Sequence, residues 1–251
     1  MKRPIIAGNW KMNLPCSQAE ELTCDLVSKF TGPQKADIII FPSFTVLKAV
    51  YGLIKETEIK IGGQNLCSQS KGAYTGEISA DMLLDCGCSY VLIGHSERRT
   101  LFDETDAEVN EKIHLALDKG LLPIVCVGET LEEREADQTK TIVARQLSIC
   151  FQGIKPESLK KIIIAYEPVW AIGTGKNATP NQALESHGFI RMTIKGLYGV
   201  EASEDMIILY GGSVSPKNSS ELLAQNGVDG VLVGSSSLIA DSFYAIIDSI
   251  N

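Results

Sequence analysis

Short runs of apolar, often β-branched residues alternate along the chain with longer segments whose apolar residues recur every three or four positions. A short continuous apolar run is typical of a strand buried on both faces, whereas the longer spacing is typical of a helix with one buried face. Val109, Ile113, Ala116 and Leu117 show the helical spacing. The pattern predicts strands at residues 5–10, 38–41, 59–64, 90–93, 123–127, 162–166, 206–210 and 230–233.

This alternation amounts to about eight βα units, the number that closes a parallel barrel with helices packed outside it. We therefore predict an α/β fold, a single (β/α)8 barrel domain over residues 1–251. A doubly wound open sheet is the alternative. It is disfavoured because no Gly-x-Gly-x-x-Gly follows the first strand, where a dinucleotide would need it. No linker, low-complexity tract or shift in composition indicates a domain boundary.

Helix start signals precede several helical segments. A Ser or Thr followed three residues later by Glu or Gln can form a capping box, and a Pro after a capping residue also favours a helix start. These signals occur at Ser17–Glu20, Thr105–Glu108, Thr130–Glu133, Thr179–Gln182 and Ser215-Pro216.

The composition excludes several classes of protein. Hydrophobic residues make up 44% of the 251 residues and charged residues 22%, as in an ordinary globular protein. The formal net charge of −8 provides no positive field for nucleic acid or an anionic membrane surface. No apolar stretch is long enough to cross a bilayer. An anionic substrate would therefore have to be held by local groups.

Targeting and metal-binding patterns are not found either. The first residues lack the apolar region of a signal peptide, so we expect a cytoplasmic protein. The seven cysteines form an odd set without disulfide spacing, which suits free thiols in a reducing compartment. The three histidines include no pair at ligand spacing, so we expect neither a metal site nor a cofactor.

The segment 165–178 has the composition of a strand that ends in a functional loop. Glu167 follows the apolar run 162–164. Pro168 has a fixed φ and also restricts the backbone of Glu167 before it. Gly173 and Gly175 lie in the loop that follows, before the capping box at Thr179. Taken alone, Glu167 is equally well interpreted as a solvated loop residue. The rest of the chain has to decide.

Polar and glycine-rich residues also follow other predicted strands. In a parallel barrel the carboxyl ends of the strands meet at one face, where active sites form. Asn9 and Lys11 follow the first strand, Gly94-His-Ser-Glu-Arg-Arg99 the fourth, Gly211-Gly-Ser213 the seventh and Gly234-Ser-Ser236 the eighth.

Four of these blocks together resemble the triosephosphate isomerase family. They are residues 7–13 (AGNWKMN), 94–99 (GHSERR), 165–178 and 210–214 (YGGSV), in the right order and spread over the whole chain. The resemblance implies a TIM barrel and the cofactor-independent interconversion of dihydroxyacetone phosphate and D-glyceraldehyde 3-phosphate in glycolysis and gluconeogenesis.

The resemblance also implies catalytic roles. Glu167 would be the base that moves a proton between adjacent carbons, and His95 would hydrogen-bond the substrate oxygens as a neutral imidazole. Lys11 and Asn9 would stabilise the developing oxyanion. Glu97 would pair with Lys11, while a second role in proton transfer stays open for it.

Phosphate would be bound mainly by backbone N–H groups. The resemblance assigns this to Gly173, Ser213, Gly234 and Ser235, aided by Asn9, Lys11 and a short helix starting near residue 235. Closure of residues 168–178 would exclude water, with Trp170 anchoring that loop. The family usually has glycine where this chain has Ser235. Serine would strain the loop if this position needs a positive φ, and otherwise it should weaken phosphate binding only modestly.

The resemblance further implies a homodimer. The long loop at 66–78 would insert beside the first-strand loop of a partner, so that Thr75 approaches the partner's catalytic lysine. Two other functions stay open: a different sugar-phosphate isomerase on the same barrel, and a non-catalytic binding module. The joint presence of Asn9, Lys11, His95 and Glu167 disfavours both.

Overall fold

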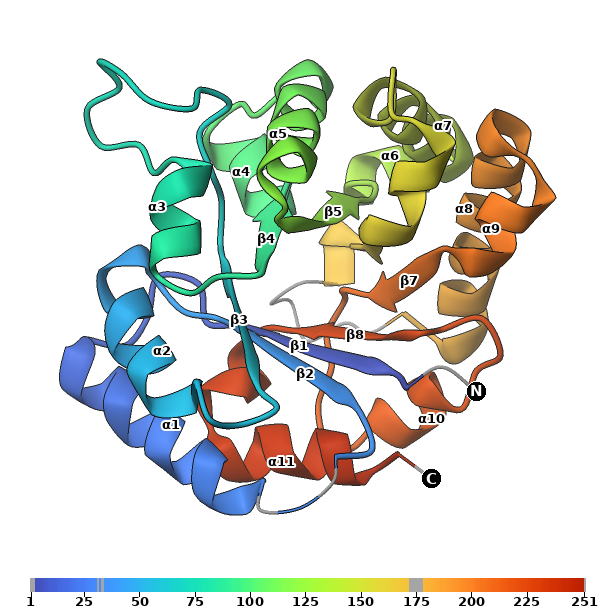
Figure 1. Ribbon diagram of the computed structural model, residues 1–251. Coiled ribbons are helices and arrows are strands. Elements are labelled where there is room, and N and C mark those ends of the chain that lie inside the picture. The colour runs from blue at the N-terminus through green and yellow to red at the C-terminus, as the bar shows by residue number, and fades with distance from the viewer. Residues whose placement is uncertain (1–2, 31, 33, 172–177, 251) are drawn as a thin grey trace.

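The computed structural model describes residues 3–30, 32, 34–171 and 178–250 (Figure 1). Within this part of the chain, eight parallel strands close into a barrel in sequence order, with β8 paired to β1. The predicted fold is confirmed, and each predicted strand end lies within one residue of the observed one. The strands are β1 (Ile5–Asn9), β2 (Asp37–Phe41), β3 (Lys60–Gly63), β4 (Tyr90–Ile93), β5 (Leu122–Val127), β6 (Ile163–Tyr166), β7 (Ile207–Tyr210) and β8 (Gly230–Val233).

Helices surround the barrel on its outer face (Figure 1). The α-helices are α1 (Cys16–Lys29), α2 (Leu47–Ile54), α3 (Ala80–Asp85), α4 (Ser96–Leu101), α5 (Asp106–Lys119), α6 (Leu131–Glu135), α7 (Thr139–Cys150), α8 (Pro180–Tyr198), α9 (Val200–Asp205), α10 (Ser219–Leu223) and α11 (Ala240–Asp248). Short 3₁₀ helices are η1 (Phe44–Val46), η2 (Pro156–Lys161), η3 (Val169–Ala171) and η4 (Ser235–Leu238). None of the helices in the described residues is both long and apolar enough to span a membrane.

Two buried clusters explain why the sequences of the strands are continuous apolar runs. The smaller cluster consists of strand residues alone and includes Ile5, Ala7, Ile39 and Phe41, so it fills the inside of the barrel. The larger cluster contains the intervening strand residues together with apolar side chains of the helices. Each strand is therefore buried on both faces, and a polar residue can be tolerated only near a strand end.

The helix start signals are confirmed at three places. Thr105, Thr130 and Thr179 each accept a hydrogen bond from the backbone N–H three residues on, and the Glu or Gln there completes the capping box.

Two expected starts are wrong. Helix α1 begins at Cys16 directly after Pro15, whose fixed φ starts the helix before Ser17 can cap it. After β7, helix α10 begins only at Ser219. The backbone N–H of Ser215 donates to Oδ1 of Asn218 at 2.8 Å, which closes a turn over the intervening residues instead of a helix.

Candidate active site

A cavity of about 290 Å³ lies at the carboxyl ends of β1, β4, β6, β7 and β8. We call it the mouth cavity. Its lining includes most of the residues proposed from the sequence, namely Asn9, Lys11, His95, Glu167, Ser213, Gly234 and Ser235. Glu97 lies beside it, bound to Lys11. Thr75 is exposed on the 66–78 loop and does not line it. Gly173 lies outside the described residues.

Glu167 is held one residue beyond the end of β6. Its N–H continues the pairing of β6 with β5 by donating to Val127 O at 2.7 Å. The residue is only 2% exposed, and Oε2 accepts a hydrogen bond from the N–H of Ser96 at 2.8 Å. A Cβ atom on Gly128 would lie 1.7 Å from the Glu167 carbonyl oxygen, so only glycine allows β5 and β6 to approach this closely.

His95 is the N-cap residue of α4. Its Nδ1 accepts a hydrogen bond from Glu97 N at 3.2 Å, so Nδ1 carries no proton and the ring proton of the neutral imidazole is on Nε2.

The base and the histidine face each other. His95 Nε2 lies 3.1 Å from Glu167 Oε1. Oε1 nevertheless has no hydrogen-bond partner among the described residues, which shows that the Nε2–H of His95 does not point at it. The close distance and the absent bond are compatible, since a hydrogen bond requires both a short distance and alignment. Both groups therefore keep a free site for a ligand.

The backbone of Lys11 adopts a left-handed conformation, with a φ of 54°. Its N–H donates to Asn9 Oδ1 at 3.0 Å, and its ammonium lies 2.5 Å from Glu97 Oε1. Gln64 also donates from Nε2 to the carbonyl oxygens of Lys11, at 2.8 Å, and Phe41, at 2.9 Å. Gln64 was predicted only as the last residue of a strand, without this role. A polar side chain directly after a buried strand was the only local signal.

The opposite wall of the mouth cavity is formed by small residues after β7 and β8. Gly211, Gly212 and Ser213 follow β7, and Gly234 precedes η4. Ser235 is not among the residues with a positive φ. Ser235 therefore does not strain the loop in the way that a positive φ at this position would require. Among the lining residues that the structure describes, Lys11 is the only cation.

Glu129 is a buried carboxylate that was not predicted from the sequence. It is fully buried and accepts hydrogen bonds from Tyr166 Oη at 3.0 Å, Trp170 Nε1 at 2.9 Å and Arg134 Nη1 at 3.0 Å. Burial, followed by the charge of Glu129, raises the pKa of Tyr166. The expected anchoring of Trp170 is thus supported, and Glu129 is its partner. Its only sequence signal was a position just after a strand.

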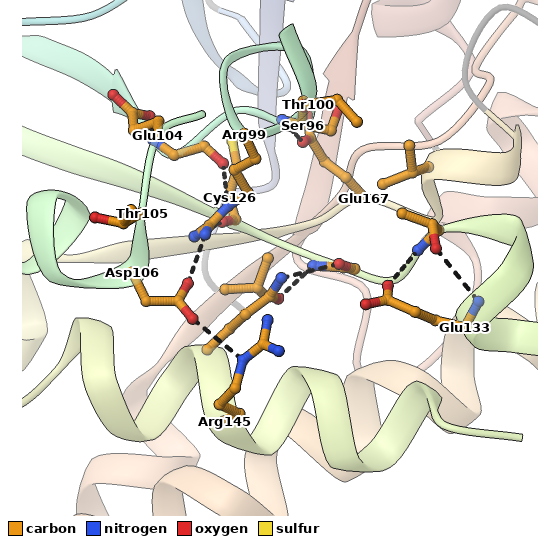
Figure 2. A pocket seen from close by; sticks show the side chains of 16 residues that line it. Ser96, Arg99, Thr100, Glu104, Thr105, Asp106, Cys126, Glu133, Arg145 and Glu167 are labelled. Carbon is orange, nitrogen blue, oxygen red and sulfur yellow. Dashed lines mark hydrogen bonds and ion pairs between the residues drawn. The ribbon is translucent and has the colours of Figure 1, made fainter. Parts of the chain in front are cut away.

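A second cavity, of about 380 Å³, lies behind Glu167, and we call it the rear cavity (Figure 2). Its lining includes Ser96, Arg99 and Cys126. Cys126 is fully buried beside Glu167, and burial raises its pKa well above the usual value, as expected for a packing residue. Arg98 forms a salt bridge with Glu104, and Arg99 forms one with Asp106.

Metal binding finds no support in the described residues, where no three His, Cys, Asp or Glu side chains are grouped to hold an ion.

Comparison with known proteins identifies the family. The family pattern described as triosephosphate isomerase matches residues 4–250. A protein of Geotalea uraniireducens named triosephosphate isomerase is 51% identical over 247 residues, covering 98% of each chain. Proteins of the same name from Moorella thermoacetica and Dictyoglomus thermophilum are 49% and 47% identical, covering 99% of this chain and 99% and 100% of their own. The chain therefore belongs to the triosephosphate isomerase family.

Proposed function

We propose that this chain interconverts dihydroxyacetone phosphate and D-glyceraldehyde 3-phosphate through an enediolate. It would act in glycolysis and gluconeogenesis as a single cytoplasmic barrel domain. The observation that carries the proposal is that Glu167 and His95 face each other at 3.1 Å in the mouth of a barrel of this family. Moving a proton between adjacent carbons requires a base within reach of both and a donor to the oxygens, and these two groups supply them.

Glu167 is the proposed base. Its Oε1 has no hydrogen-bond partner among the described residues, whereas Oε2 is held by the N–H of Ser96. Substrate entering the mouth cavity would draw the carboxylate away from Ser96 and toward the reacting carbons. The base would then take a proton from one carbon as a carboxylate and return it to the neighbouring carbon as a carboxylic acid.

His95, Lys11 and Asn9 are proposed to stabilise the enediolate. The neutral His95 ring offers its Nε2–H to the two oxygens in turn, and the Lys11 ammonium supplies positive charge. Glu97 orients that ammonium through their 2.5 Å contact. Since Asn9 accepts the N–H of Lys11 through Oδ1, its amide nitrogen is left to donate to the substrate.

Phosphate is proposed to bind at the β7 and β8 side of the mouth cavity. Ser213, Gly234 and Ser235 line this side, and the start of η4 would offer backbone N–H groups to an anion. Gly173 would contribute from the loop at 168–178 when that loop closes over the phosphate. Closure would keep water from the enediolate and hinder the loss of phosphate.

A homodimer is proposed as the active form. Figure 1 shows the loop between β3 and α3 projecting from the barrel, and its Tyr74 is 48% exposed. Met12, beside Lys11, is 95% exposed, and Phe102 is 66% exposed after α4. Large exposed apolar side chains of this kind favour a partner surface. Thr75 of one chain would then support Lys11 of the other.

A coupled assay with D-glyceraldehyde 3-phosphate, without added metal or cofactor, tests the activity. We expect rapid turnover by the wild type and near-complete loss in Glu167→Gln, which keeps the side-chain shape but removes the base. Equal activity of both proteins would place the base elsewhere. Inactivity of both would favour the binding-module alternative.

The dimer is tested separately with Thr75→Arg and Tyr74→Ala, using sedimentation to measure mass and circular dichroism to measure fold. We expect folded monomers with greatly reduced turnover. Full activity in a proven monomer would refute the proposed coupling.

A further inference from the structure

Arg99 joins the ends of two neighbouring strands behind the catalytic pair (Figure 2). Its Nε donates to Gly94 O at 2.8 Å, and its Nη2 donates to Cys126 O at 3.2 Å. Nη1 lies 2.5 Å from Asp106 Oδ1, which neutralises the guanidinium. The side chain is only 16% exposed. A buried, bidentate guanidinium fixes the positions of both groups that it binds.

The guanidinium of Arg99 with its two carbonyl partners, which we call the fork, lies where the pairing of β4 with β5 ends. The pairing of β4 with β5 ends at Ile93 and Val125, and Gly94 then turns the chain into α4 with a φ of 73°. A Cβ atom on Gly94 would lie 3.0 Å from Arg99 Nη2, so a glycine leaves room for the guanidinium. It also adopts the positive φ of the turn without strain. One residue beyond the last strand pair, Arg99 thus replaces the sheet as the link between β4 and β5.

Both carbonyl groups that Arg99 holds are adjacent to the reacting side chains. Gly94 directly precedes His95, and the Cys126 side chain lies beside Glu167. The next residue, Val127, accepts the backbone N–H of Glu167. The relative position of β4 and β5 therefore sets the 3.1 Å distance between the histidine and the base.

We propose that Arg99 is a positioning residue for the proton transfer, acting through the carbonyl groups of Gly94 and Cys126. The proposal rests on the roles proposed above for His95 and Glu167. Ser213, Gly234 and Ser235, which are proposed to bind phosphate, follow β7 and β8, and none of the hydrogen bonds of Arg99 goes to them. Loss of the fork should therefore lower kcat and leave KM nearly unchanged, because misplaced reacting groups slow the chemistry without removing contacts to phosphate.

Two Arg99 variants and one matched control test this. Arg99→Ala removes the fork, while Arg99→Lys keeps the charge but cannot bridge two carbonyl groups. Arg145→Ala is the control, because Arg145 lines the same cavity and binds Asp106 without reaching either carbonyl group. We expect kcat to fall about 10- to 100-fold in both Arg99 variants, with KM within about threefold of wild type. For Arg145→Ala we expect kcat and KM within about twofold of the wild-type values.

Chemical rescue separates positioning from a general loss of structure. The rear cavity, of about 380 Å³, opens onto Arg99 and would admit a guanidinium ion after truncation to alanine. Guanidinium far below denaturing concentrations should restore part of kcat in Arg99→Ala but not change kcat in Arg145→Ala. An unchanged kcat in Arg99→Lys, or losses confined to KM, would overturn the proposal. Turnover by the wild type in the same assay tests the proposed function independently.

Discussion

The two walls of the mouth cavity are built in different ways. The wall formed by the residues after β4 and β6 presents charged and ring side chains, with Glu167 2% exposed and His95 6% exposed. The wall formed by β7 and β8 presents glycine and serine. Proton transfer requires groups that change their protonation state at fixed positions, and these are usually side chains such as His and Glu. An anion requires only hydrogen-bond donors, which the backbone supplies, so a chain of net charge −8 needs no basic patch.

The support behind the two walls differs as well. Buried residues brace the first wall, including Glu129 behind β6 and Arg99 behind β4 and β5. The second wall is braced by hydrogen bonds to main-chain oxygens. Asn218 Nδ2 donates to Ser213 O and Ser237 Oγ to Gly234 O, while Ser236 Oγ donates to Val214 O between the ends of β8 and β7. Substitutions on the first wall should therefore affect turnover, and those on the second should affect substrate binding.

The largest expected effect is that of His95→Gln. Glutamine can donate a hydrogen bond but cannot take the place of the ring between Glu97 N and the mouth cavity. We expect kcat to fall about 100- to 1,000-fold, with KM within a few-fold of wild type. Steady-state kinetics would measure this, with His114→Gln on helix α5 as a control that retains activity. A retained kcat with a raised KM would break the proposed division between the walls.

The next effect concerns the pH dependence of stability. His187 packs edge-on against Tyr166 of β6, and burial lowers its pKa from 6.5 to about 4. The unfolded chain binds the proton more tightly, so this stabilisation is complete above pH 6.5 and is lost as pH falls toward 4. The loss should amount to about 3 kcal/mol.

Urea unfolding at several pH values would measure this effect. His187→Asn keeps a donor for Gly227 O and should unfold with a flatter pH dependence between pH 6.5 and 4. Parallel curves for the two proteins would show that His187 is not the group responsible.

Glu129→Gln should have a smaller effect. The amide keeps one acceptor oxygen for Tyr166 and Trp170 but removes the charge that pairs with Arg134. We expect about 1–3 kcal/mol lower stability, because the remaining partners become less well satisfied. Turnover should fall several-fold if this cluster supports the loop that starts at Pro168. Thermal unfolding and kcat would both be measured, and an unchanged melting temperature would contradict the prediction.

The smallest expected effect is that of Ser235→Gly on the second wall. Ser235 has no positive φ, so glycine relieves no strain and the backbone N–H is the same in both proteins. We expect KM to change by less than about threefold, well below the tenfold change that 1.4 kcal/mol would produce. A tenfold lower KM in the glycine variant would show that the serine side chain hinders phosphate binding.

Much of the fold was predictable because its information is local. The strands were found from continuous apolar runs, which follow from burial on both faces. Thr105, Thr130 and Thr179 were found as helix caps because a capping box involves residues only three apart. The errors at Ser17 and Ser215 arose where neighbouring residues, Pro15 and Asn218, changed the local backbone.

The sequence by itself determined which residue types stand at the strand ends and, through the family resemblance, which of them to test. The family resemblance also implied the pairing of Lys11 with Glu97, 86 residues away, which the structure confirms. Only the tertiary structure showed that Glu167 is held by Ser96, 71 residues away. It also identified Gln64, Glu129 and Arg99 as supports. Local patterns report which face of an element is buried. Contacts across the mouth depend on how the strands align when the barrel closes, and no short stretch of sequence records that alignment.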